Sequence, residues 1–170
     1  MDPTLTPLTA ISPVDGRYRK STERLSAFFS EAVLIKYRLM VEVEYFIALC
    51  ELPLPQLTAL NGTPATVLRQ IYTDFSLSDA RRVKDIEKTT NHDVKAVEYF
   101  LKEKFDQLQL ASFKEFIHFG LTSQDINNTA LPYGLKKGWL EVVKPVLIEV
   151  IDALTDKARR WKDIPMLART

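Results

Sequence analysis

The chain has 170 residues, of which 46% are apolar and 26% are charged, and its formal net charge is +1. This composition excludes an intrinsically disordered chain, and the balanced charge, without any long basic block, argues against a nucleic-acid partner. Five glycines are few for this length, which favours helices over folds built on glycine-rich phosphate loops.

Three features indicate where the protein works. Met1–Ser12 has no basic stretch followed by an apolar core, so no secretory signal is expected. The most apolar run, residues 32–50, includes four charged residues, which excludes a membrane span. The single cysteine, Cys50, lies in this run and is typical of a buried thiol in a reducing compartment. We therefore expect a cytoplasmic protein without a membrane partner.

The first elements are an extended lead and a long helical region. Three prolines within residues 1–15 disfavour regular structure there. A helical region is predicted from about Thr22 to Leu52, with Ser21 and Ser30 as candidate N-caps and a break near Ser30. Apolar residues surround nearly the whole helix from 33 to 49, so this helix must be covered on several sides.

Three shorter helices are expected next. Thr63-Pro64 predicts a helix that continues to about Phe75, because proline is favoured at the first helical position. Ser78-Asp79 predicts a second helix, ending near Thr89. The third follows Asp93 and has an apolar face made of Val94, Val97, Leu101, Phe105 and Leu108. Glu98 and Lys102 are expected to pair on its other face. A short apolar helix is then predicted over 113–119.

The longest predicted element begins at Thr122. Its apolar stripe comprises Leu140, Val143, Leu147, Val150, Leu154, Ala158 and Trp161. The stripe extends over roughly 33 Å of helix. The polar face comprises Glu141, Lys144, Glu149, Asp152, Lys157 and Arg160. Pro132 and Pro145 should kink this helix without ending it.

No segment alternates as a strand does, so the fold class is all-α. We expect a small N-terminal helical domain over residues 1–120 and the start of a helical-bundle domain over 121–170. The long helix needs antiparallel partners, and the sequence offers none of matching length. We therefore interpret the chain as the N-terminal part of a larger protein.

Three polar segments are candidates for binding, namely Arg17-Tyr18, Asn91–Asp93 and Thr122-Ser123. Arg17-Tyr18 suits a phosphate, because the arginine fork bonds two oxygens at once, but such a pair is also common on surfaces. Thr122 and Ser123 open a capping-box pattern, which by itself only starts a helix. The same helix start presents free N–H groups and two hydroxyls, which suit a carboxylate.

Both histidines lie near such segments. His118 is surrounded by apolar residues, as a hydrogen-bonded core histidine would be. His92 lies between Asn91 and Asp93 just before a helix, where either neighbour could cap the helix and the carboxylate would favour a charged ring. Structural and ligand-binding roles both stay open there. Two histidines without a cysteine cluster do not form a metal site of usual spacing.

Three segments together resemble the adenylosuccinate lyases, a family of the fumarase/aspartase superfamily. They are Ser12–Tyr18 (SPVDGRY), Thr89–Phe100 (TTNHDVKAVEYF) and Phe116–Asn128 (FIHFGLTSQDINN). The resemblance covers nearly the whole chain and is closest to the bacterial branch. Argininosuccinate lyase and fumarase share the bundle and the Thr-Ser helix start, but not the SPVDGRY turn.

The resemblance implies an all-helical homotetramer with active sites shared among subunits, no cofactor and no metal. The reaction releases fumarate from adenylosuccinate to leave AMP, and likewise from the succinylated carboxamide intermediate of purine synthesis. The residues that the resemblance assigns to substrate are Arg17 and Tyr18 for the phosphate and ribose end, Asn91, His92 and Asp93 for the pocket, and Thr122 and Ser123 for the succinyl carboxylates. His118 would have a supporting role.

The resemblance also implies where proton transfer takes place. In the family, the Arg-Thr pair seen here as Arg169-Thr170 is followed at once by the general-acid histidine, and the serine that acts as base lies further on. No catalytic proton-transfer residue is therefore expected within residues 1–170, and this segment alone should be inactive. The alternatives are another lyase of the superfamily, or a non-catalytic helical module that docks partner helices through its long stripe.

Overall fold

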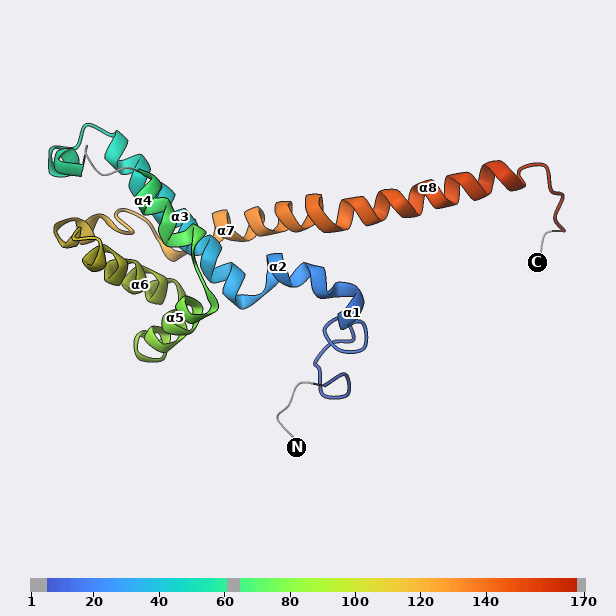
Figure 1. Cartoon of the computed structure of the whole chain (residues 1–170), viewed down its shortest axis with the longest axis horizontal. Helices are drawn as coiled ribbons and strands as arrows, with labels where there is room; N and C mark the ends of the chain where they lie inside the picture. The colour runs from blue at the N-terminus through green and yellow to red at the C-terminus, as the bar shows by residue number, and fades with distance from the viewer. Residues whose placement is uncertain (1–5, 61–64, 168–170) are drawn as a thin grey trace.

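The computed structural model describes residues 6–60 and 65–167, and within them every regular element is a helix. The chain forms a head of packed helices from which one long helical rod projects (Figure 1). The predicted all-α class is confirmed. The elements before the rod are α1 (Arg19–Thr22), η1 (Glu23–Leu25), α2 (Ser26–Phe29), α3 (Glu31–Glu51), η2 (Pro55–Leu60), α4 (Ala65–Thr73), α5 (Leu77–Thr90), α6 (Asp93–Gln107) and η3 (Ala111–Phe116).

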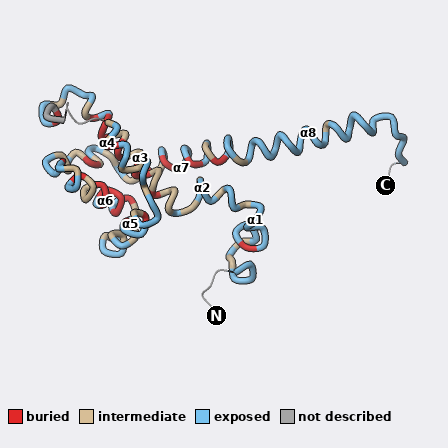
Figure 2. Tube along the Cα trace, in the orientation of Figure 1, coloured by how far each residue is buried: buried red, intermediate tan, exposed pale blue. Residues whose placement is uncertain are grey.

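Helix α3 is the centre of the head. It packs against α2, α4, α5, α6 and α7, which confirms the prediction from its all-round apolar sequence. Its buried side chains include Leu39, Val43 and Phe46, and the Phe46 ring meets Phe105 of α6 edge-on with centroids 4.9 Å apart. Figure 2 shows that burial is concentrated in this head. Each such buried side chain contributes roughly 1.5–3 kcal/mol, so α3 is fixed firmly against its neighbours.

The helix starts agree only partly with the predictions. Ser30 interrupts the first helical region as expected, but Ser21 lies inside α1 and caps nothing. Helix α5 is capped by Ser76 rather than Ser78, because Asp79 lies three residues after Ser76 and its Oδ2 accepts the Ser76 N–H at 3.0 Å. The Thr63-Pro64 start lies outside the described residues, and the helix that follows, α4, ends at Thr73.

Helix α6 buries the predicted face, with Val94, Val97, Leu101 and Phe105 each at most 1% exposed. Glu98 pairs with Lys102 at 3.1 Å as expected. This other face of α6 is not fully solvated, because the Glu98 side chain is only 6% exposed. The short helix predicted over 113–119 is present, but it is the 3-10 helix η3, which begins at Ala111 and ends at Phe116. His118 and Gly120 then adopt left-handed backbone angles.

The rod is one continuous helical structure made of α7 (Ser123–Gly138), the π-helical turn η4 (Trp139–Val143) and α8 (Lys144–Trp161). Pro145 has no N–H to donate to the Glu141 carbonyl and its ring crowds that oxygen, which accounts for a π-helical turn just before it. The predicted continuation of the helix through Pro132 and Pro145 is confirmed. The main contacts between the rod and the described part of the head are those of α7 with α2, α3 and α6.

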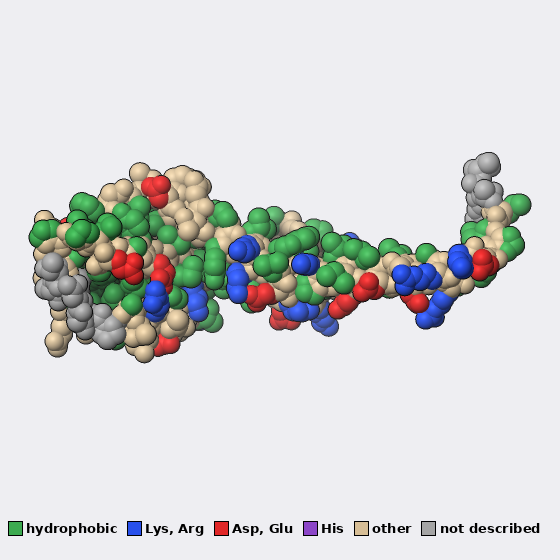
Figure 3. Space-filling view, turned by 90° about the horizontal axis from the view of Figure 1, so that it is seen from above, with side chains coloured by type: hydrophobic (Ala, Val, Ile, Leu, Met, Phe, Trp, Pro, Cys, Tyr) green, Lys and Arg blue, Asp and Glu red, His purple; other side chains and the backbone are tan. Residues whose placement is uncertain are grey.

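Helix α8 has no buried residue within this chain. Side chains of the predicted stripe are exposed, for example Val150 at 50% and Leu154 at 63%, and apolar side chains cover much of the rod in Figure 3. The described helices include none that is long and apolar enough to cross a membrane. The stripe therefore stays largely uncovered by the described part of the chain.

Candidate functional site

Two helix N-termini meet on one side of the head. Helix α6 begins at Asp93 with His92 as its N-cap, and α7 begins at Ser123 with Thr122 as its N-cap. The Ser123 Oγ lies 3.4 Å from the His92 Nε2. Each N-terminus carries the positive end of a helix dipole and N–H groups without a helical partner. Two such ends side by side form a polar corner suited to an anion.

His92 itself caps α6, where the sequence had suggested Asn91 or Asp93. Its Nδ1 accepts the Lys95 N–H at 3.2 Å. With Nδ1 engaged in this cap, the ring presents its Nε2 toward Ser123. Asn91 instead ends α5, with a left-handed φ of 51° and its N–H bonded to the Glu87 carbonyl at 2.7 Å.

Asp93 is held by Arg38 of α3. The Arg38 guanidinium is 2.7 Å from the Asp93 Oδ2, and its Nε donates to the Asn127 Oδ1 on α7 at 2.9 Å. Partial burial by itself would raise the pKa of Asp93, but the Val94 N–H and Arg38 lower it more, and the net pKa lies below its ordinary value. Arg38 therefore ties the start of α6 to the first turns of α7.

The Thr122 capping box predicted from sequence is present. The Asp125 Oδ2 accepts both the N–H and the hydroxyl of Thr122, each at 2.7 Å. The Thr122 hydroxyl is thus engaged within its own helix start. The Ser123 hydroxyl instead faces His92 and is the better placed of the two for a ligand.

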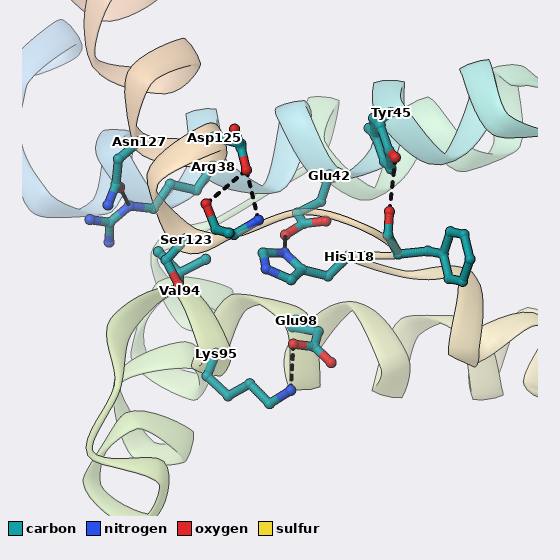
Figure 4. A network of polar contacts seen from close by, with 12 residues as sticks. Arg38, Glu42, Tyr45, Val94, Lys95, Glu98, His118, Ser123, Asp125 and Asn127 are labelled. Carbon is teal, nitrogen blue, oxygen red and sulfur yellow. Dashed lines mark hydrogen bonds and ion pairs between the residues drawn. The ribbon is translucent and has the colours of Figure 1, made fainter.

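His118 is half-buried and hydrogen-bonded, as the core interpretation predicted. Its Nδ1 lies 2.5 Å from the Oε1 of Glu42, whose side chain is fully buried. Burial raises the pKa of Glu42 above its ordinary value, Glu98 adds to this, and the bond from His118 opposes it. Figure 4 shows the His118 ring between Glu42 on α3 and Glu98 on α6.

Arg17 and Tyr18 do not join this corner within the chain. They precede α1, which lies beside the rod and away from α5 and α6 (Figure 1). Tyr18 is 50% exposed, and the Arg17 guanidinium lies 4.6 Å from the centroid of its ring. The structure thus brings together His92, Asp93, Thr122 and Ser123, with His118 behind them, and leaves Arg17 and Tyr18 apart.

Three charged residues near the corner were not singled out from the sequence: Arg38, Glu42 and Glu98. All three are buried, with at most 6% of the residue exposed. A signal was available for two of them, because charges are rarely buried unless they are paired, and α3 is apolar all round. An open groove formed by residues of α5, α6 and η3 is lined by Arg82, Tyr99 and Lys114, among others, but by none of the residues assigned to substrate.

Comparison with known proteins places this geometry in a family. The family model described as Lyase matches residues 16–170, so the chain belongs to this lyase family of the fumarase/aspartase superfamily. The adenylosuccinate lyase of Dictyostelium discoideum is 54% identical over 168 residues, which are 96% of this chain and 36% of that protein. The adenylosuccinate lyase of Escherichia coli (strain K12) is 45% identical over 168 residues, or 98% and 37% of the two chains.

A third similar protein, the adenylosuccinate lyase of Legionella pneumophila (strain Corby), is 44% identical over 169 residues, covering 98% of this chain and 37% of that protein. The chain therefore spans little more than a third of the length of the curated relatives that it matches. The resemblance deduced from the three polar segments is confirmed.

Proposed function

We propose that the complete protein containing this chain is an adenylosuccinate lyase. It would release fumarate from adenylosuccinate to leave AMP, and from the succinylated carboxamide intermediate of purine synthesis, in the cytoplasm. The observation that carries this proposal is 54% identity, over 96% of the chain, to a protein of that name. The polar corner between α6 and α7 supports it, because the reaction needs donors that bind carboxylates.

The chemistry explains the use of two helix N-termini. A β-elimination removes a weakly acidic proton next to a carboxylate, and negative charge builds on that carboxylate. Preorganised N–H and hydroxyl donors stabilise such charge. We assign the carboxylates to Thr122 and Ser123 at the start of α7, with Ser123 in direct contact. Asn91, His92 and Asp93 would line the pocket, with His118 as support.

Arg17 and Tyr18 are assigned to the phosphate and ribose end of the substrate. Their distance from the corner within one chain supports a site shared between subunits, in which another subunit supplies them. The exposed apolar face of α8 supports the homotetramer that such sharing requires, because it stays largely uncovered by the described part of the chain. We accordingly assign residues 1–120 to a head domain and 121–170 to the start of the central bundle.

The proton-transfer residues are assigned to parts of the protein outside residues 1–170. In this chain His92 is assigned to the substrate pocket, where its Nε2 faces Ser123, and not to the role of general acid. The segment alone would bind parts of the substrate and would not turn it over. Neither a cofactor nor a metal is needed for this reaction, since donors and a general acid–base pair suffice.

The experiment is an assay of the complete protein with adenylosuccinate, following fumarate release, with argininosuccinate and malate offered in parallel. Turnover of adenylosuccinate alone is the expected result. Turnover of argininosuccinate or malate instead would assign the protein to another lyase of the superfamily. No turnover of any of the three would contradict a catalytic role. The 170-residue segment, assayed alike, should show no activity.

A further inference from the structure

A polar stripe on the central helix reaches both helix starts of the site. Arg38, Glu42 and Tyr45 are spaced at i, i+4 and i+7, so they lie on one face of α3. Arg38 and Glu42 are among the few charged residues buried in the described part of the chain. A buried charge costs free energy unless it is paired and hydrogen-bonded, so such a stripe on an apolar helix requires an explanation.

Each member of this stripe contacts the segment that precedes or begins α6 or α7. Arg38 bonds Asp93 at the start of α6 and Asn127 in α7. Glu42 bonds the ring of His118. The Tyr45 hydroxyl donates to the Phe119 carbonyl at 2.8 Å. Figure 4 shows the bonds of Arg38 with Asn127, of Glu42 with His118 and of the Tyr45 hydroxyl along one side of α3.

The connection that Glu42 and Tyr45 contact is strained. His118 has a φ of 59° and Gly120 has a φ of 71°, and the left-handed region is unfavourable for a residue with a side chain. The backbone bonds within this connection are long, with Phe119 N to Phe116 O at 3.4 Å and Leu121 N to His118 O at 3.3 Å. The backbone bonds within this connection do not offset its strain, so the contacts from α3 must do so.

We propose that Arg38, Glu42 and Tyr45 are positioning residues that hold residues 118–123 and the start of α6 in register, so that Ser123 and His92 face the same point. They act through His118, the Phe119 carbonyl, Asp93 and Asn127, and do not touch substrate. The kinetic part of this inference rests on the proposed function. The structural part does not.

Hydrogen exchange in the complete protein, without substrate, tests the structural part. Tyr45→Phe removes one hydroxyl, and Tyr72→Phe is its control because that hydroxyl bonds Glu44 on another side of α3. Loss of one hydrogen bond should speed exchange of the Phe119, Leu121 and Thr122 amides by about fivefold to tenfold. The control should leave them unchanged. Equal rates in the two variants would overturn the role of Tyr45.

The role of Glu42 is tested by two replacements, which differ in whether they retain a hydrogen-bond acceptor. Glu42→Gln retains an acceptor for His118, whereas Glu42→Leu removes it. Replacing a buried charge by an apolar side chain is often neutral or stabilising, so a residue needed only for packing would leave exchange unaffected. We expect faster exchange over residues 118–123 in the Leu variant, at an unchanged Tm, and rates within about twofold of wild type in the Gln variant. Identical exchange in both would overturn the role of Glu42.

Arg38→Lys retains the charge but cannot bridge Asp93 and Asn127 with one planar fork. Exchange of the Val94 and Lys95 amides, which bond Asp93 and His92, should rise by about fivefold. Arg69→Lys, which alters a bidentate pair with Glu44, is the matched control. Unchanged rates at Val94 and Lys95 would overturn the role of Arg38.

Kinetic measurements then test whether the position of residues 118–123 affects fumarate release. The variants that loosen residues 118–123 should lower kcat/KM for fumarate release by about fivefold or more, whereas the controls should not. Faster exchange with normal kcat/KM would overturn the link to the site. A complete protein without lyase activity would contradict the proposed function, and the exchange results would still decide whether α3 positions these helix starts.

Discussion

At the residue scale, the two histidines of the chain serve different purposes although both lie in segments that resemble lyase motifs. His92 is half exposed and presents Nε2 to Ser123 while Nδ1 caps α6. His118 turns its Nδ1 inward to a buried carboxylate. The first histidine can therefore reach a ligand, and the second holds the chain in place.

Ser123→Ala in the complete protein should lower kcat/KM for fumarate release by about 10²-fold, because it removes a donor placed where charge develops. Its Tm should change little, because Thr122 and not Ser123 is bonded to Asp125. Ser112→Ala, at an exposed position of η3, serves as control. Full activity of the Ser123 variant would contradict the assignment of the α7 start to the substrate carboxylates.

Glu98 gives a prediction about pH. Burial alone would raise the pKa of Glu98, but bonds from Lys95 and Lys102 lower it more, and the net pKa lies below the ordinary value of 4.5. An acid with a lowered folded pKa stabilises the fold above its unfolded pKa and loses this contribution as the pH falls through the folded pKa. Glu98→Gln should therefore lower Tm at pH 7 and should lose this deficit near pH 3.

Glu115→Gln is the control for that measurement, since the Glu115 side chain is 89% exposed and lies 3.9 Å from the same Lys102. Its Tm should follow that of wild type at both pH values. A Glu98→Gln deficit of equal size at pH 7 and pH 3 would show that packing, and not charge, decides the role of Glu98.

At the element scale, α7 approaches α2 and α3 through glycines. A Cβ placed on Gly134 would lie 2.9 Å from the Tyr37 Cε2 and 3.3 Å from the Phe28 carbonyl, and one placed on Gly138 would lie 2.7 Å from the Phe29 Cζ. Both distances to ring carbons are shorter than normal contacts. Because these two positions have no side chain, the rod can lie against the head, and this contact sets the position of Ser123, which lies about three to four turns earlier in the helix.

Gly134→Val should destabilise the complete protein by about 1–3 kcal/mol through overpacking, seen as a fall in Tm. Lys136→Val is the matched control, because it introduces the same β-branched residue at an exposed position of α7 without the clash. If both variants lowered Tm equally, helix propensity rather than close packing would explain the loss.

At the scale of the whole molecule, the head has its own core and the rod does not. Helix α8 exposes a continuous apolar face along its length, whereas the head buries α3 from several sides. Burial of apolar surface is the main driving force for association, so the proposed assembly depends on this exposed face of α8.

Val150→Asp should dissociate the proposed tetramer of the complete protein, because it would place a carboxylate in the covered face. Light scattering would give the mass. Arg159→Asp is the control, since Arg159 lies outside the predicted stripe and the change alters charge without entering it. An unchanged mass in the Val150 variant would count against an assembly through this face.

Spacing in the sequence was sufficient for most of the helices, for the Thr122 capping box and for the apolar faces of α6 and α8, because each depends on residues three or four positions apart. It misplaced the caps of α5 and α6. The resemblance supplied the assignment of His92, Asp93 and Ser123 to one site. Their convergence, with His92 and Ser123 thirty-one residues apart, depends on how α6 and α7 pack on α3, and local spacing contains no information on that packing.

Tertiary structure alone decided the roles of the buried charges. In the sequence, Glu42 is only an acidic residue within an apolar helix. Local spacing does not identify its partner, because His118 is 76 residues away. Glu98 satisfies an ordinary i,i+4 pattern, yet it is buried because His118 and α3 cover it. Whether a charge is solvated or enclosed depends on what packs over it. This is why the sequence determined most of the helices and the Thr122 cap, while the fold determined which polar groups support the site.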